Sequence, residues 1–127
     1  MKNLLLLGSI FGFLAVALGA FGSHSLESIW LKSPNSKDIF ETAVKYQFYH
    51  VFAILACSIL LKLFPTNTWL LYAGYTFTAG ILLFSGSLYI LSTTGIKMPW
   101  VFITPLGGLC YLVGWFILIW QSFKLVK

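Results

Sequence analysis

Charged residues are so scarce in this chain that they leave four long stretches almost free of charge. Only 9% of the 127 residues are charged. A helix needs roughly 20 apolar residues to cross a hydrocarbon layer of about 30 Å, and three of the stretches are that long. The second is shorter, but it extends through Lys62, whose ammonium group can snorkel to the interface. The four stretches are residues 3–23, 46–61, 63–96 and 98–123.

The composition excludes a water-soluble fold, because a chain of this size needs a polar shell that these residues do not supply. Hydrophobic residues make up 59% of the chain and the mean hydropathy is +0.91, both far above globular averages. We therefore predict an all-α membrane protein, with residues 1–127 forming one integral membrane domain folded as a bundle of four transmembrane helices. The spans are expected at about residues 3–23, 38–64, 69–93 and 104–123.

Capping and turn residues set the boundaries of spans two and three. Asp38 and Glu41 have the spacing of a capping box, which predicts that the second helix starts at Asp38. Pro65 begins a tight turn that makes spans two and three an antiparallel hairpin. Gly95 is a typical helix terminator and predicts the end of span three.

The fourth span contains a glycine pair just after its expected start. Thr104 followed by Pro105 predicts that the helix begins there, while the alternative is one helix from Pro99 that is kinked at Pro105. Gly107 and Gly108 leave a thin helix face, which favours tight packing against span three. The same pair would also leave amides at a helix N-terminus free to receive an anion.

Small residues recur along one face of the first span, at spacings of 4, 3, 4 and 3. Such a stripe lets a neighbouring backbone approach closely, so we expect span one to pack in the centre of the bundle or against a second protomer. Gly86, between two serines in span three, is a further predicted packing residue. The stripe consists of Gly8, Gly12, Ala15, Gly19 and Gly22.

Five polar residues at the end of span one and the start of span two form the candidate functional cluster. His24 ends span one and His50 is expected about one turn inside span two, near the same interface. Two imidazoles and a carboxylate can bind zinc or copper or relay protons, whereas a structural clamp needs only hydrogen bonds to neighbouring groups. No ligand spacing such as H-x-x-x-H occurs, so we predict no metal and no cofactor. The cluster comprises His24, Glu41, Lys45, Gln47 and His50.

The positive charge predicts membrane lipids as partners. The net charge is +5, and the lysines lie at the ends of the spans, where cations meet anionic headgroups. Lys45 is expected to reach lipid phosphate or to point inward at an anionic ligand. Nucleic acid is excluded, because no basic cluster or aromatic platform accompanies the charge.

Two belts of aromatic residues are expected at the two membrane faces. An even number of spans places both termini on one side, and the acids of the first loop favour the cytoplasm for the termini. Labelling of a cysteine at Ser33 by an impermeant maleimide in intact cells tests this orientation, and protection there would reverse it. The belts are Trp30, Tyr46, Tyr49, Tyr89 and Trp100 at one face and Trp69, Tyr72 and Trp120 at the other.

Four segments, taken in order, carry a resemblance to a known family. Together they resemble the small four-span membrane proteins catalogued as domain of unknown function 423, which are similar to a small eukaryotic transmembrane protein. The resemblance implies a four-helix fold in the bacterial inner membrane and lends no catalytic residues. The segments are residues 18–24 (LGAFGSH), 40–50 (FETAVKYQFYH), 80–89 (GILLFSGSLY) and 103–108 (ITPLGG).

Three functional hypotheses follow from these features. The first is a non-enzymatic membrane protein that packs against itself, as a homo-oligomer, or against a membrane protein partner. The second is a small transporter or channel that handles a cation through His24, His50 and Gln47. The third, an intramembrane enzyme, is the weakest, because the chain has no Ser/His/Asp set, HExxH motif or acidic pair.

Overall fold

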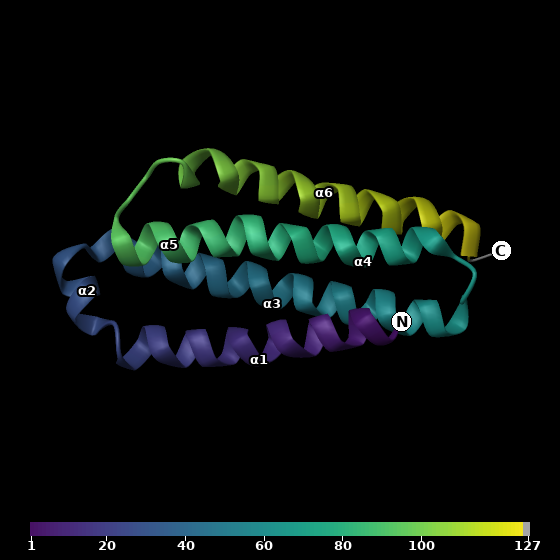
Figure 1. Ribbon diagram of the computed structural model, residues 1–127, viewed down its shortest axis with the longest axis horizontal. Helices are drawn as coiled ribbons and strands as arrows, with labels where there is room; N and C mark the ends of the chain where they lie inside the picture. Colours follow the sequence, from purple (N-terminus) through teal and green to yellow (C-terminus); the bar gives the residue numbers. More distant parts are fainter. Residues whose placement is uncertain (126–127) are drawn as a thin grey trace.

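The structure is a computed structural model that describes residues 1–125 and, apart from Lys32 and Pro34, their side chains. Residues 126 and 127 of the expected domain lie outside the described part. Four long helical rods run side by side, and both termini lie at the same end of the bundle (Figure 1). The elements are α1 (Lys2–His24), α2 (Glu27–Lys32), α3 (Pro34–Leu63), α4 (Thr68–Gly80), the π-helical turn η1 (Ile81–Ser85), α5 (Gly86–Thr94) and α6 (Trp100–Leu125).

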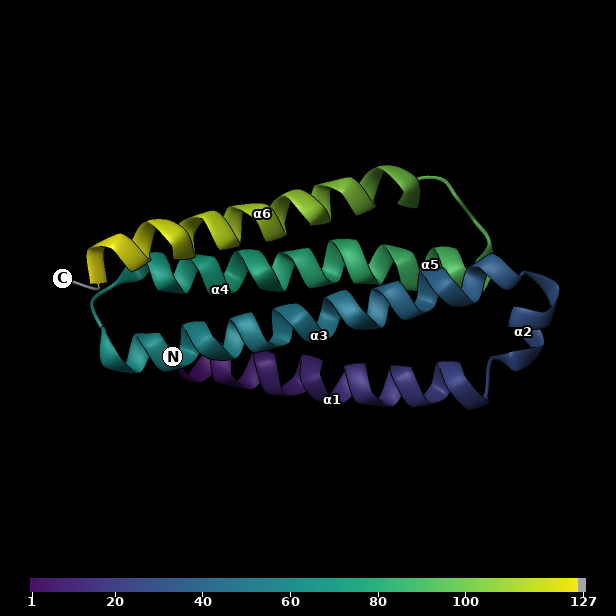
Figure 2. The ribbon, with the colours of Figure 1, turned by 180° about the vertical axis from the view of Figure 1, so that it is seen from behind.

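The predicted four-span bundle is confirmed. Within residues 1–125, four helical rods are long and apolar enough to cross a membrane, and α4, η1 and α5 together form one of them. Gly95 ends α5 with a left-handed backbone at φ 70°, as its position after the span predicts. The short α2 bridges the ends of α1 and α3 (Figure 2).

The predicted start of the second span at Asp38 is wrong. Helix α3 begins at Pro34, and Asp38 lies inside it, where its carbonyl accepts a hydrogen bond from the Thr42 hydroxyl at 2.8 Å. Proline fixes φ near the helical value and has no amide to leave unpaired, so it suits a first helical turn better than a preceding loop. The capping-box spacing of Asp38 and Glu41 therefore has no capping role.

The fourth span also starts earlier than predicted. Helix α6 begins at Trp100 and contains Pro105, which resembles the alternative of one helix running through Pro105. Proline there removes the hydrogen bond to the carbonyl four residues back and crowds that carbonyl, and the Thr104 hydroxyl donates to the Trp100 carbonyl at 3.0 Å. Gly107 and Gly108 thus lie in the helix interior, and the hypothesis of free N-terminal amides beside them is wrong.

The two central rods are α3 and the α4–α5 rod, with α1 packed mainly along α3 and α6 mainly along the α4–α5 rod. The two central rods are more deeply buried than the two flanking helices. In the most apolar part of each rod, 44% of residues are buried in α3 and 33% in the α4–α5 rod, but only 17% in α1 and 22% in α6. The flanking helices α1 and α6 therefore keep most of their apolar surface on the outside of the bundle.

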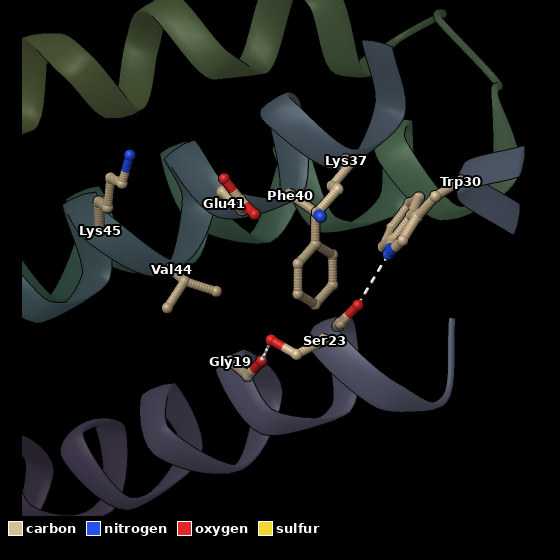
Figure 3. A pocket seen from close by; sticks show the side chains of 9 residues that line it. Gly19, Ser23, Trp30, Lys37, Phe40, Glu41, Val44 and Lys45 are labelled. Carbon is tan, nitrogen blue, oxygen red and sulfur yellow. Dashed lines mark hydrogen bonds between the residues drawn. The ribbon is translucent and has the colours of Figure 1, made fainter. Parts of the chain in front are cut away.

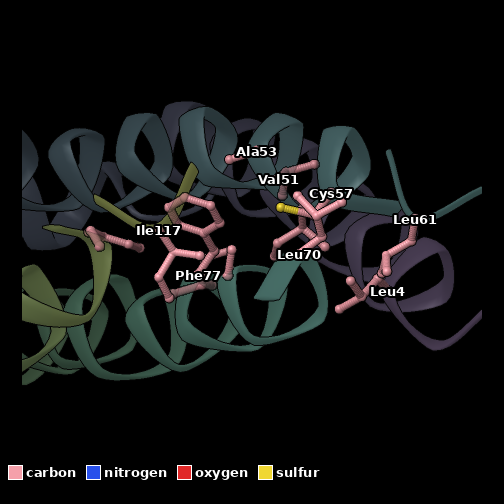
Figure 4. Close-up of a cluster of buried hydrophobic side chains, with 12 residues drawn as sticks. Leu4, Val51, Ala53, Cys57, Leu61, Leu70, Phe77 and Ile117 are labelled. Atoms are coloured by element: carbon pink, nitrogen blue, oxygen red, sulfur yellow. The ribbon is translucent and has the colours of Figure 1, made fainter. Parts of the chain in front are cut away.

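The hydrophobic core lies between α3, α4 and α6 (Figure 4). Its largest fully buried side chains include Phe77, Ile54 and Leu70. Leu4 joins it from α1 because Gly74 of α4 leaves room, and a β-carbon at Gly74 would overlap the Leu4 side chain. At the end that carries the termini, Trp69 packs edge-on against Tyr72 and Trp120, so the predicted belt there forms one cluster.

The small-residue stripe of α1 faces α3 of the same chain. A β-carbon at Gly22 would overlap the Phe40 ring, and one at Gly8 would come 2.7 Å from Leu55. Gly12 and Gly19 are less tight, at 3.4 and 3.5 Å from valine methyl carbons, and Ala15 is fully buried. The stripe therefore serves packing inside the bundle, and its face is not open to a second protomer.

The glycines of α5 and α6 differ sharply in what they contact. A β-carbon at Gly107 would overlap the backbone of Phe84 in η1, whereas one at Gly108 would be 3.8 Å from the Phe84 ring. A β-carbon at Gly86 would be 4.0 Å from the Ile81 carbonyl oxygen and close to nothing else. The prediction of Gly86 as a close-packing residue is wrong, because the π-helical turn brings α6 against Phe84 instead.

The Gly107 contact predicts an asymmetric response to one substitution at neighbouring positions. Gly107→Ala should lower the free energy of unfolding by about 1–3 kcal/mol, because backbone cannot rotate out of the way of a methyl group. Gly108→Ala should leave stability within about 0.5 kcal/mol of the wild-type value, since its β-carbon meets an ordinary contact. Denaturant-induced unfolding in detergent micelles measures both. Equal losses would mean that α6 does not approach η1 at Gly107.

Candidate functional site

Gln47 bridges three helices near the middle of the bundle. It lies on α3, and only 2% of its surface is exposed. Its Nε2 donates to the carbonyl of Phe11 in α1 at 2.8 Å, and its Oε1 accepts from the Tyr89 hydroxyl of α5 at 2.7 Å. Gly12 and Ala15 of α1 are small and pack against α3, which lets the two backbones lie close enough for the amide to reach a backbone oxygen.

His50, one turn further along α3, joins α3 to α6. Its Nδ1 lies 2.7 Å from the Tyr46 carbonyl, which can only accept, and its Nε2 lies 3.2 Å from the indole Nε1 of Trp115, which can only donate. These partners assign the neutral imidazole with its proton on Nδ1. The ring stacks on Tyr111 of α6, with 3.4 Å between centroids and 5° between planes. Both imidazole nitrogens are thus engaged inside the protein.

Hydroxyl groups beside the π-helical turn η1 make two further links between helices. The Ser85 hydroxyl donates to the Ala43 carbonyl of α3 at 2.8 Å, and the Ser87 and Thr104 hydroxyls share a hydrogen bond at 2.6 Å. Ser85 is the last residue of the π-helical turn and Ser87 lies two residues beyond it. The first serine therefore bonds to α3 and the second to α6.

The structure separates the two histidines of the predicted cluster. His24 is exposed at the end of α1, where Gly22 packs on Phe40. His50 lies ten residues beyond Phe40 in α3, which is about 15 Å deeper at 1.5 Å per residue. The placement of His50 one turn from the interface is therefore wrong. Among residues 1–125, no group of three His, Cys, Asp or Glu side chains could hold a metal ion.

Glu41 and Lys45 line a groove between α1 and α3 (Figure 3), and neither Gln47 nor His50 is among its lining residues. The groove has a volume of about 130 Å³, and Lys37, Trp30 and Phe40 also line it. The Trp30 indole donates to the Gly22 carbonyl at 2.7 Å and closes the groove toward α2. The predicted cluster therefore falls into three parts. His24 is exposed at the end of α1, Glu41 and Lys45 line an open groove at the bundle end, and Gln47 and His50 form a buried polar centre.

Several residues that bond or pack inside the bundle were not predicted from the sequence. Trp115 and Tyr111 appear in the sequence as ordinary aromatic residues of a span, and only the helix register reveals that they meet His50. Gln121 carried a usable signal, because an amide inside a transmembrane segment is costly without a partner. Nothing in the sequence marks Gly80 as a packing residue, although a β-carbon there would overlap the Tyr111 ring.

Two buried polar atoms lack a hydrogen-bond partner among the described residues, namely the Tyr111 hydroxyl and the Gln121 Nε2. Tyr111 belongs to the polar centre, where its ring packs between His50 and Gly80. Gln121 lies nearer the end of α6, where its Oε1 accepts from Asn67 Nδ2 at 2.8 Å. Apart from the Tyr111 hydroxyl, the buried side-chain polar atoms of the polar centre have hydrogen-bond partners among residues 1–125.

Comparison with known proteins identifies the family. The model of the family described as "Protein of unknown function (DUF423)" matches residues 18–108. The chain belongs to this family. The matched residues begin at the first resembling segment and end at the last, so the resemblance found in the sequence is confirmed. No solved structure matches the chain.

Relatives of this DUF423 protein cover nearly its full length. It is 40% identical to the UPF0382 membrane protein SAB0533 of Staphylococcus aureus over 98% of each chain, and 39% identical to the UPF0382 membrane protein YwdK of Bacillus subtilis over 98% of each. It is 33% identical to the UPF0382 inner membrane protein YgdD of Escherichia coli, over 99% of this chain and 93% of that one. With its four apolar helices, the chain is a membrane protein.

The Trp115–His50 hydrogen bond predicts different effects for one substitution at two equally exposed tryptophans. Trp115→Phe should lower the free energy of unfolding by about 1–3 kcal/mol, because it leaves the His50 Nε2 buried without a donor. Trp69 is also 44% exposed, as Trp115 is, but lies in the belt. Trp69→Phe should therefore change stability by less than about 0.5 kcal/mol. Equal effects in a detergent unfolding assay would refute a structural role for this hydrogen bond.

Proposed function

We propose that this DUF423 protein is a non-enzymatic, multi-pass protein of the bacterial inner membrane, with both termini in the cytoplasm. It acts by packing against itself or against another membrane protein. The proposal rests on the hydrogen-bond partners of the buried polar side chains. Gln47, His50 and Ser85 each bond to a neighbouring helix, so their hydrogen-bonding capacity serves the bundle rather than a substrate.

The outer face of α6 supports packing against a partner. Trp115, Phe116 and Ile119 line a shallow apolar groove of about 460 Å³ there. Aromatic side chains on a helix that is buried on one side only offer a large contact area for van der Waals packing, which drives helix association in lipid. The small-residue face of α1, in contrast, is occupied by α3, so α6 is the better candidate for an interface.

The alternative is a small cation transporter or channel that uses His24, His50 and Gln47. A conducting path needs polar groups along the whole depth of the bundle. Between His50 and the end of the bundle that carries the termini, apolar side chains fill the space between α3, α4 and α6. They include Phe77, Ile54 and Leu70. His24 and His50 also lie at different depths. Both observations favour the packing function over transport.

Single-cysteine cross-linking in membranes tests the packing function. With Cys57 and Cys110 replaced by alanine, Phe116→Cys should form disulfide-linked dimers under mild oxidation, because it lies on the proposed face of α6. Phe52→Cys on α3 is the matched control, since the two phenylalanines are 68% and 64% exposed and the His50–Trp115 contact places them at a similar depth.

Two results would contradict the proposal. Equal cross-linking of Phe116→Cys and Phe52→Cys would indicate random collisions in the membrane rather than an α6 interface. Cation flux into proteoliposomes above that of protein-free vesicles, abolished by His50→Gln, would support the transporter instead. A glutamine at this position keeps hydrogen-bonding groups but is a poor substitute for imidazole in cation or proton handling.

A further inference from the structure

An apolar groove lies at the end of the bundle that carries the termini, where α3 ends, α4 begins and α6 ends. Its volume is about 250 Å³. Its walls are the side chains of Leu60 from α3, Phe64 just after α3, Leu70 from α4, and Leu118 and Leu125 from α6, together with Gln121 and Ser122. The amide of Gln121 is the polar side-chain group of this wall that lacks a complete set of partners.

The orientation of the Gln121 amide follows from its neighbours. The Asn67 side chain accepts a hydrogen bond from the Trp69 amide through Oδ1 at 3.1 Å and thereby caps α4. Asn67 must therefore present its Nδ2 to Gln121, and the atom that it meets at 2.8 Å must be the acceptor Oε1. This chain of partners leaves the Gln121 Nε2 as a donor with no acceptor among residues 1–125.

Such a donor calls for an acceptor. Gln121 is only 2% exposed, and an amide N–H buried in apolar surroundings without a partner carries the full cost of its lost hydration. The acyl chains of the bilayer offer it no acceptor. Gln121 lines the adjoining groove, but its Nε2 is almost fully covered, so a ligand there supplies the acceptor only when the amide turns toward the groove. Such a ligand is apolar along most of its length and carries one carbonyl oxygen.

The position of the groove along the membrane normal indicates which kind of ligand this is. Helix α6 has 26 residues, about 39 Å at 1.5 Å per residue, against roughly 30 Å of hydrocarbon. Gln121 lies four residues from its end, about 6 Å inside, which places it at the boundary between acyl chains and headgroups. Trp120 and Trp69 mark the same level, and the Lys124 ammonium lies 3.9 Å from the Trp120 ring, toward the phosphate layer.

We propose that this groove is a binding site for an ester-linked glycerophospholipid of the surrounding bilayer. The first part of one acyl chain lies between α3 and α6, and its ester carbonyl accepts a hydrogen bond from the Gln121 Nε2. Lys124 meets the phosphate of the same lipid. The site is at the opposite end of the bundle from the Glu41–Lys45 groove and is independent of the proposed packing through α6.

Comparison of an ester lipid with its ether analogue tests the carbonyl contact. The purified protein in detergent is titrated with dioleoyl phosphatidylglycerol and, separately, with the dioleyl diether of the same headgroup, and bound lipid is counted by native mass spectrometry. Wild-type protein should bind the ester lipid about fivefold more tightly, the ratio that one ordinary hydrogen bond supplies. Gln121→Leu keeps the volume and removes the donor, so its ratio should fall to about one.

Ser122→Ala is the matched control. Ser122 also lines the groove, but its hydroxyl already donates to the Ile119 carbonyl at 2.7 Å, so this variant should keep the wild-type ratio. Equal affinity of the wild-type protein for the two lipids would overturn the proposal, even if Gln121→Leu fails to fold. A preference for the ester lipid that persists in Gln121→Leu would overturn the assignment to Gln121.

Discussion

A polar group buried in a bilayer must find its hydrogen-bond partner within the protein, because lipid tails offer none. Gln47 meets this constraint with both ends of its amide, which join α3 to α1 and to α5. The hydrogen bond to α1 is made to the Phe11 carbonyl of its backbone, so it limits how far α1 can slide along α3. One side chain thus sets the register of three helices, and the contacts above and below it follow from that register.

The register matters because each of several glycines receives a side chain or a stretch of backbone from the facing helix. Gly22 receives the Phe40 ring, Gly74 receives Leu4, and Gly107 receives the backbone of Phe84. A shift of one helical turn would place a large side chain against another and leave the glycines facing empty space, with the loss of dispersion contacts on both sides. The hydrogen bonds between helices and the glycine contacts therefore support each other, and the polar centre acts in the first place as a positioning device.

Hydropathy and small-residue spacing predict the four spans and the packing face of α1, because both depend on local patterns along one helix. The boundaries at Pro34 and Pro105 were misjudged because a proline can begin a helix or lie within its first turns, and the local sequence does not decide between these. The depth of His50 and its contact with Trp115 depend on how α3 aligns with α1 and α6, which no pattern within one span contains. The π-helical turn at Ile81–Ser85 lies against Gly107 of α6 and likewise has no signature of its own in the sequence.

The central claim is that the Gln47 amide couples the helices energetically, and a double-mutant cycle with Tyr89 measures this coupling. The wild-type protein, Gln47→Leu, Tyr89→Phe and the double variant are unfolded in mixed micelles, and the interaction free energy is the departure from additivity. The structure predicts a coupling of about 0.5–1.5 kcal/mol, the range found for hydrogen bonds between transmembrane helices. Strict additivity of the two substitutions would contradict the account, because it would mean that the hydrogen bond at 2.7 Å does not hold α3 and α5 together.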